Sequence, residues 1–286
     1  MDSVNKTLYI PLYGKALVSR RGILLKDRKS EMIWEKEGFP LKGKAASKWL
    51  AFSMAMRGKV FDVWTENKLR EHPDAVVLPL PKGKYADLKR CYKKGQLFIA
   101  GMTDEAIEAE AKAQEWRMKR VMEDETFLME NAILTAEGAV YKAMCARKGA
   151  LCRCRCLVAG YGRIGKVLTG MLRGLGSDVT VAARREATRR AAGDNSVDML
   201  QMADVAGKMD MVFNTVPSVI FTEEILKTMR KDVVLMELAS APYGMDMEAA
   251  VRLGLNVQIE GGLPGRYCPR DAAKAWMDFI ERSVRE

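Results

Sequence analysis

Three glycines in the second half of the chain have the spacing of a phosphate-binding turn. They follow the apolar run at residues 157–159 and stand at positions 160, 162 and 165. The first glycine of such a G-x-G-x-x-G pattern allows a tight turn, the second lets the backbone approach a pyrophosphate, and the third lets the next helix pack close to the strand. That helix offers N–H groups and the positive end of its dipole to phosphates. The pattern predicts a dinucleotide-binding turn, with candidate contact residues Gly160, Tyr161, Gly162, Arg163, Ile164 and Gly165.

The next expected strand, residues 179–182, ends in a way that bears on the kind of dinucleotide. NAD sites usually carry an acid at this strand tip for the ribose hydroxyl, whereas a nearby arginine accommodates a 2′-phosphate. Here the tip is Ala183, Arg184 and Arg185, without an acid. The sequence therefore predicts NADP as the cofactor, with NAD as the alternative.

Two later strand ends are further candidates for cofactor contact. Ligands of open α/β sheets bind beyond the carboxyl ends of the strands. The alternative is simple loop punctuation, because glycine and proline are common in turns. The candidate residues are Asn214, Thr215, Val216, Pro217, Leu238, Ala239 and Ser240.

Alternating apolar runs and helical patterns position these residues. Five short strands are expected at residues 155–159, 179–182, 211–215, 233–238 and 257–259, with helices between them and a last helix at about 270–284. This order predicts an α/β fold, a doubly wound parallel sheet of the Rossmann type.

Upstream, the pattern is shorter and different in kind. Strands are expected at 75–80 and 97–100, a long helix from residue 103, and another helix at 131–147. We therefore predict three parts: a helical N-terminal extension at 1–70, a smaller partial α/β layer with a connecting helix at 71–150, and the Rossmann-type domain at 151–286 with its C-terminal helix. We expect that helix to pack back on the layer at 75–130.

Composition limits the other classes of function. The 286 residues carry a net charge of +10, but basic residues are scattered among acidic ones and no nucleic-acid-binding motif is present, so no nucleic-acid partner is predicted. No apolar run approaches the roughly 18 residues of a membrane span. The N-terminus lacks the apolar core of a signal peptide. We therefore expect no membrane association and a cytoplasmic location.

Cysteine and histidine content argues against a metal site. Cys152, Cys154 and Cys156 would share one face of a strand, and this spacing is a poor match for the Cys-x-x-Cys loops of zinc sites. We predict thiols and no metal. The single histidine, His72, argues against histidine-based acid–base chemistry.

Several of these motifs together resemble one family. From about residue 131 to the C-terminus the chain is similar to the A-type chains of dipicolinate synthase, and residues 75–130 resemble them less sharply. The matching motifs are residues 135–138 (Thr-Ala-Glu-Gly), 160–165, 181–184, 213–218, 238–240 and 262–265.

This resemblance implies an oxidoreductase of sporulation. It implies that a dihydrodipicolinate-type precursor is oxidised to dipicolinate, pyridine-2,6-dicarboxylate, with a nicotinamide dinucleotide. It also implies a second, flavoprotein-like partner, the B-type chain of dipicolinate synthase. A dicarboxylate substrate needs cations, and Arg266 and Arg270 near the Gly-Leu-Pro-Gly turn are the candidates. Ordinary surface arginines are the alternative.

The base that would take a proton is less well defined by the sequence. Without a suitable histidine it must be a carboxylate, a tyrosine, a lysine or water. Glu137 is the catalytic candidate, because its helix is expected to face the cleft. The alternative is a solvated helix acid.

The N-terminal stretch resembles another class of enzyme. Residues 7–68 are similar to the opening of class I O-methyltransferases of the leucine-carboxyl and polyketide type, through residues 8–16, 25–27 and 47–50. The chain leaves that pattern near residue 69, before the Gly-rich strand that would hold S-adenosylmethionine. A methyltransferase and a non-catalytic dinucleotide-binding fusion are thus the alternative functions.

Overall fold

The computed structural model describes residues 75–78, 97–101, 103 and 105–285, together with the single helical residues 20, 28, 31, 32, 35, 63, 67, 70 and 71. The predicted methyltransferase-like segment, apart from those single residues, and His72 lie outside the described residues. The chain divides into two compact units, Met1–Leu128 with Pro269–Glu286 and Met129–Cys268.

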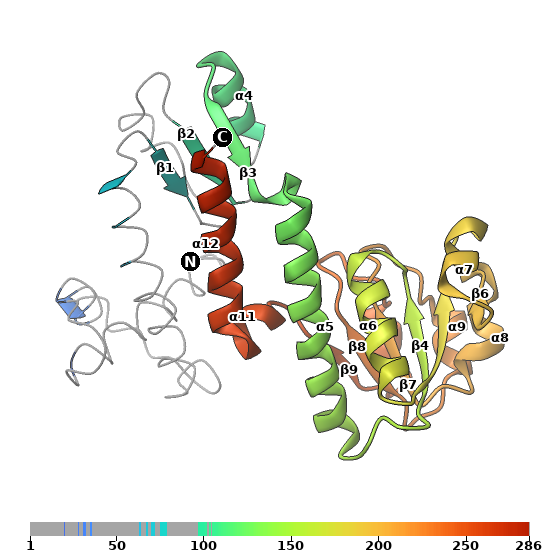
Figure 1. Ribbon diagram of the computed structural model, residues 1–286. Helices are drawn as coiled ribbons and strands as arrows, with labels where there is room; N and C mark the ends of the chain where they lie inside the picture. Colours follow the sequence, from blue (N-terminus) through green and yellow to red (C-terminus); the bar gives the residue numbers. More distant parts are fainter. Residues whose placement is uncertain are drawn as a thin grey trace. The chain divides into compact units, whose positions relative to one another are not determined.

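The second unit contains a six-stranded parallel sheet (Figure 1). Its strands are β4 (Arg155–Ala159), β5 (Asp178–Ala182), β6 (Ser196–Val197), β7 (Met211–Asn214), β8 (Val234–Glu237) and β9 (Val257–Ile259). Their order is β6-β5-β4-β7-β8-β9. The predicted doubly wound parallel sheet is confirmed, with one strand more than expected: β6 has two residues, which is too short to leave a pattern in the sequence.

Helices cover both faces of this sheet. On one face α5 (Glu125–Arg147), α6 (Arg163–Gly174) and α11 (Leu263–Tyr267) share a core with strand residues such as Val158 and Phe213. On the other, η4 (Met199–Gln201), α8 (Met202–Ala206), α9 (Glu223–Thr228) and α10 (Met247–Arg252) pack on Leu157 and Val212. Helix α7 (Glu186–Ala192) joins β5 to β6. Successive strand residues thus feed opposite cores, as a sheet buried on both sides requires.

The direction of winding changes beside β4. From β4 the chain continues to β5 and β6 on one side, then crosses over to β7, β8 and β9 on the other. In open α/β sheets, ligands bind at such a switch point, outside the carboxyl ends of the strands. The Gly-rich turn directly follows β4 and therefore lies at this switch point.

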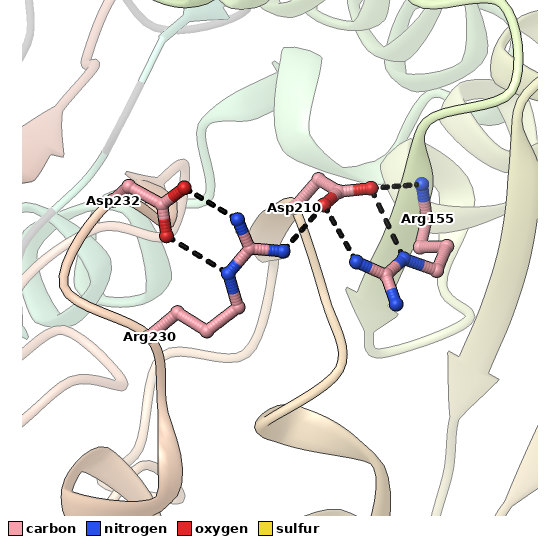
Figure 2. A network of polar contacts seen from close by, with 4 residues as sticks. All are labelled: Arg155, Asp210, Arg230 and Asp232. Atoms are coloured by element: carbon pink, nitrogen blue, oxygen red, sulfur yellow. Dashed lines mark hydrogen bonds and ion pairs between the residues drawn. The ribbon is translucent and has the colours of Figure 1, made fainter.

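A network of charged side chains joins three strands at their amino-terminal ends, at the end of the sheet away from the Gly-rich turn (Figure 2). The Asp210 carboxylate accepts hydrogen bonds from the backbone N and Nε of Arg155, at 2.9 and 3.2 Å, and from Nη1 of Arg230 at 3.0 Å. Arg230 also pairs with Asp232. The Arg155 hydrogen bond is the main reason why the pKa of Asp210 falls to about 2. The network joins the amino ends of β4, β7 and β8.

The first unit contains a smaller parallel sheet. Its strands β1 (Ala75–Leu78), β2 (Leu97–Ala100) and β3 (Arg117–Arg120) lie in chain order, with α4 (Glu105–Ala113) before β3 and η3 (Val121–Glu123) after it. Helix α12 (Pro269–Arg285) brings Phe279 and Ile280 into one core with Leu97 and Ile99. The C-terminal helix thus packs on the 75–130 layer, as expected, and belongs with that unit instead of with the 151–286 domain to which the sequence assigned it.

Two upstream elements differ from the sequence expectations. The helix expected from residue 103 ends at Ala113, Glu115 takes a positive φ of 52°, and the charged strand β3 follows. The helix expected at 131 begins at Glu125, because the Asp124 carboxylate accepts a hydrogen bond from the backbone N of Phe127 at 2.6 Å and caps it. Among the described helices, none is both long enough and apolar enough to cross a membrane.

Candidate functional site

Two glycines of the turn after β4 are required by close contacts. Gly160 has a φ of 93°, and a Cβ there would lie 2.4 Å from Oγ1 of Thr215. A Cβ on Gly165 would lie 2.2 Å from the carbonyl oxygen of Gly160. A side chain at position 160 would strain the backbone and collide with the Thr215 side chain, and one at position 165 would force helix α6 away from the turn. The first and third glycines therefore have the roles that their spacing predicts.

Gly162 is different, because a side-chain Cβ at this position would contact no neighbouring atom of the protein. It is the N-cap of α6 with an extended backbone, φ −76° and ψ −164°, and no heavy atom lies within 4 Å of its Cβ position. The first N–H groups of α6 have no partner within the helix and begin at this point. An open space beside a helix N-terminus fits a diphosphate, so the residues present suit a dinucleotide.

The other residues of the turn are less available. Tyr161 is half-buried, its hydroxyl donates to the carbonyl of Ala191 at 3.5 Å, and the Lys166 ammonium lies 5.8 Å from its ring. Arg163 is exposed as the first residue of α6, whereas Ile164 packs on the core beneath the helix. The turn can thus offer a ligand its backbone N–H groups, but not the Ile164 side chain.

The tip of β5 carries three arginines and one acid from the neighbouring strand. Ala183 is buried, while Arg184 and Arg185 are exposed. Nη1 of Arg189 donates to the carbonyls of Ala183 and Arg184 at 2.8 and 2.6 Å. The same nitrogen lies 2.6 Å from Oδ2 of Asp198, which follows β6. Reasoning from sequence missed this pair, because strand pairing alone brings Asp198 to the tip of β5.

A cavity of about 440 Å³ lies beside this pair, beyond β6. It stands on the β5–β6 side of the switch point, next to the strand tip that carries Arg184 and Arg185. Its lining residues are Arg189, Ser196, Val197, Asp198, Leu200 and Gln201. Leu200, one of these lining residues, is 93% exposed.

The end of β7 lies directly beside the Gly-rich turn. The Thr215 hydroxyl donates to the carbonyl of Ala159 at 2.8 Å, and the Asn214 side chain is fully buried. Nδ2 of Asn214 donates to the carbonyl of Val216 at 2.9 Å, while Pro217 is exposed. The Asn214 amide is therefore committed to the protein, and a ligand would meet Thr215, Val216 and Pro217 instead.

The end of β8 contains a buried acid that sequence reasoning did not single out. The Glu237 side chain has no exposed surface and accepts a hydrogen bond from Nδ2 of Asn214 at 2.7 Å. Burial raises the pKa of Glu237, and the hydrogen bonds to its carboxylate oppose that shift. Beyond it, Leu238 is buried, Ala239 half-buried and Ser240 exposed.

Comparison with known proteins supports a domain that binds a nicotinamide dinucleotide. Residues 135–249 match the sequence model of a family described as "D-isomer specific 2-hydroxyacid dehydrogenase, NAD binding domain". The chain is also 23% identical, over 193 residues, to the A-type chain of dipicolinate synthase from Bacillus subtilis (strain 168). That match covers 66% of this chain and 65% of the length of its relative.

Solved structures agree with the sequence match. The crystal structure of the A-type chain of dipicolinate synthase from Bacillus halodurans superposes with a TM-score of 0.68 at 23% identity, over 74% of this chain and 80% of that one. The corresponding B. subtilis structure gives 0.68 at 22% identity, over 74% and 78%. The chain has the fold of the dipicolinate synthase A-type chains. A transhydrogenase from Sinorhizobium meliloti follows with 0.57 at 20% identity, over 74% of each chain. Together the matches support a dinucleotide-binding, oxidoreductase-like protein with a nicotinamide cofactor.

Of the residues predicted for chemistry, Glu137 and Arg266 lie in the second unit and Arg270 in the first. Glu137 is exposed on α5, with Sγ of Cys268 3.7 Å from its Oε2. Nη1 of Arg266 lies 2.7 Å from the buried carboxylate of Glu260, so its charge is partly compensated. Arg270 is exposed in α12, and its role toward a substrate stays a prediction.

Glu260 is shared by two cations, Lys142 and Arg266, so this cluster carries one positive charge in excess. Besides Arg266, Nζ of Lys142 lies 2.9 Å from Oε1 of Glu260, and this partner raises the pKa of Lys142. The guanidinium of Arg266 also stacks on the Tyr267 ring, 5.1 Å from its centroid. Two cations that share one carboxylate can still accept an anion. Lys142, a residue that sequence reasoning missed, thus joins Arg266.

The cysteines give no indication of a metal. Cys154 and Cys156 are buried, and burial raises the pKa of the Cys156 thiol to about 12. Cys152 is exposed. Within the described ranges, no group of three or more His, Cys, Asp or Glu residues is arranged to hold a metal ion.

Proposed function

We propose that this protein is an NADP-dependent oxidoreductase of the dipicolinate synthase A type, which oxidises a dihydrodipicolinate-type precursor to dipicolinate in sporulation. The observation that carries the proposal is the turn at the switch point, where Gly160 and Gly165 are required by contacts and Gly162 faces open space beside a helix N-terminus. The similarity to the A-type chain of dipicolinate synthase supplies the substrate.

The cofactor choice rests on the tip of β5. Arg184 and Arg185 are exposed there, and within the described part of the chain neither has a carboxylate partner. Two acids near this tip are already paired, Asp198 with Arg189 and Glu186 with Arg190. Charge-assisted hydrogen bonds from arginine favour a 2′-phosphate over a ribose hydroxyl.

The chemistry requires one hydride and one proton to leave the dihydropyridine ring. A bound NADP⁺ would supply the hydride acceptor. Glu137 is the carboxylate that we propose for the proton, and Arg266 with Lys142 would attract the carboxylates of the substrate. The flavoprotein-like B-type chain of dipicolinate synthase is the proposed partner.

The decisive experiment is an assay of the purified chain with the dihydrodipicolinate precursor and NADP⁺, with and without the B-type chain. The expected result is NADPH formation with a matching amount of dipicolinate. NADPH binding without turnover in both mixtures would support the non-catalytic alternative. Absence of NADPH binding would contradict the proposal at its base.

A further inference from the structure

A single buried carboxylate joins the two strand ends on the far side of the switch point. Glu237 is the last residue of β8 and pairs in register with Asn214, the last residue of β7. Both side chains are fully buried. Neither position is in the Gly-rich turn, yet both stand at the edge where the sheet would receive a ligand.

Each oxygen of Glu237 accepts two hydrogen bonds. Oε1 accepts from Nδ2 of Asn214 at 2.7 Å and from the backbone N of Ala239 at 3.0 Å. Oε2 accepts from the backbone N of Gly244 at 2.9 Å and of Met245 at 3.1 Å. All four partners are donors, so the group is matched to the ionised, acceptor-only form of the side chain.

These four bonds fix the loops after both strands. The loop between β8 and α10 is held near its start by Ala239 and near its end by Gly244 and Met245. The bond from Asn214 connects Glu237 to the start of the loop after β7. A Cβ on Gly244 would lie 2.2 Å from Nδ2 of Asn214 and 2.6 Å from the carbonyl oxygen of Val216. The two loops therefore pack against each other at Gly244, with no space left for a side chain there.

The constraint extends to the Gly-rich turn. Asn214 accepts a hydrogen bond from the backbone N of Val216 at 3.1 Å. A Cβ on Gly160 would lie 2.9 Å from Cγ2 of Val216 and 2.4 Å from Oγ1 of Thr215. A displacement of the loop after β7 would thus change the space beside the turn.

We propose that Glu237 is a positioning residue of the cofactor site, which as a carboxylate holds the loops after β7 and β8 in the shape that receives the nicotinamide half of the dinucleotide. The inference rests on the proposed function. The adenosine half would lie on the other side of the switch point, toward β5 and β6, where Glu237 makes no contact. The two halves should therefore respond differently when Glu237 is changed.

The test compares NADPH with adenosine 2′,5′-bisphosphate, which carries only the adenosine half. In Glu237→Gln, whichever oxygen becomes an amide nitrogen faces two donors and loses both bonds. Titration calorimetry should show NADPH binding weakened by at least about tenfold, as expected for unmade buried hydrogen bonds, with the bisphosphate within about twofold of wild type. Amide exchange at Gly244 and Met245 should accelerate.

Asp210→Asn is the matched control, because it weakens the same sheet at the amino-terminal ends of its strands, away from the cofactor site. It should lower the melting temperature but leave the affinity for both ligands unchanged. If Glu237→Gln does not fold, Asn214→Ala carries the test, because it removes one of the four hydrogen bonds to Glu237 and adds no atom to the site. Its expected result is the same selective loss of NADPH.

Three results would overturn the inference. One is unchanged NADPH affinity in folded Glu237→Gln, or in Asn214→Ala where that variant carries the test. Another is an equal loss of both ligands, which would indicate general destabilisation. The third is wild-type protein that binds neither ligand, which would also remove the proposed function. Wild-type binding of NADPH with no selective loss in the variants would refute the inference alone.

Discussion

Replacing Gly162 by valine should remove dinucleotide binding while leaving the fold intact. The space around this position is open, with no heavy atom within 4 Å of the Cβ position, and its backbone is extended and suits any L-residue. A valine there would occupy the volume in which a pyrophosphate would approach the N–H groups of α6.

The magnitudes of the two effects can be separated. Valine is a poorer N-cap than glycine by up to about 1 kcal/mol, and the loss of glycine's freedom in the unfolded chain returns about 0.4–1 kcal/mol. The net change in folding free energy should stay within about 1 kcal/mol, which is a shift in melting temperature of about 4 °C or less. Two lost charge-assisted hydrogen bonds of about 1.5–3 kcal/mol each would weaken NADPH binding by at least about 100-fold.

The assay pairs thermal unfolding with calorimetric titration of NADPH. Gly170→Val is the matched control: Gly170 lies in the same helix, is exposed, and has no atom within 4 Å of its Cβ position. Because valine has the higher helix propensity, this control should melt at or slightly above the wild-type temperature and bind normally. Normal NADPH binding by Gly162→Val with normal melting would show that the turn does not receive a pyrophosphate.

Four further outcomes are expected. Gly165→Ala should lower the melting temperature strongly in thermal unfolding, because its Cβ would lie 2.2 Å from a backbone carbonyl oxygen; an unshifted transition would contradict this geometry. Changing Arg184 and Arg185 together to alanine should weaken NADPH by about 1–3 kcal/mol and NADH far less in parallel titrations, and equal losses would refute the NADP assignment. Asp210, whose pKa is about 2 in the folded protein, should contribute about 1–2 kcal/mol of stability above pH 4, and this contribution should be lost between about pH 4 and 2. The free energy of unfolding, measured with urea across this range, should therefore depend less on pH in Asp210→Asn than in the wild type. S-Adenosylmethionine should give a flat calorimetric titration, because the doubly wound sheet of the described residues carries the dinucleotide turn, and micromolar binding would favour the methyltransferase alternative.

The central sheet was predictable because its strands are short apolar runs with turns on both sides. The charged strand β3 and the two-residue strand β6 were not, because neither carries the apolar alternation by which a strand is recognised. In both cases the neighbouring strand decides the conformation.

The candidate site was likewise only partly predictable from the sequence. The glycine spacing predicted the turn, and contacts of Gly160 and Gly165 agree with the roles expected of them. The burial of Asn214 against Glu237 depends on two strands whose residues are far apart in the sequence, as does the Arg189–Asp198 pair. Partners of this kind follow from strand order, which a single sequence does not specify.

The return of α12 to the first unit has a consequence for the order of folding. The core that holds Leu97 and Ile99 needs Phe279 and Ile280, and the whole of the second unit lies between them in the chain. Closing a loop of that length in an unfolded chain carries an entropic penalty that grows with its length. If the second unit folds first, the path from Met129 to Cys268 is already fixed, and the segment that remains to be closed is much shorter. We therefore expect the second unit to fold first and on its own, and the core built from the two outer segments to form after it.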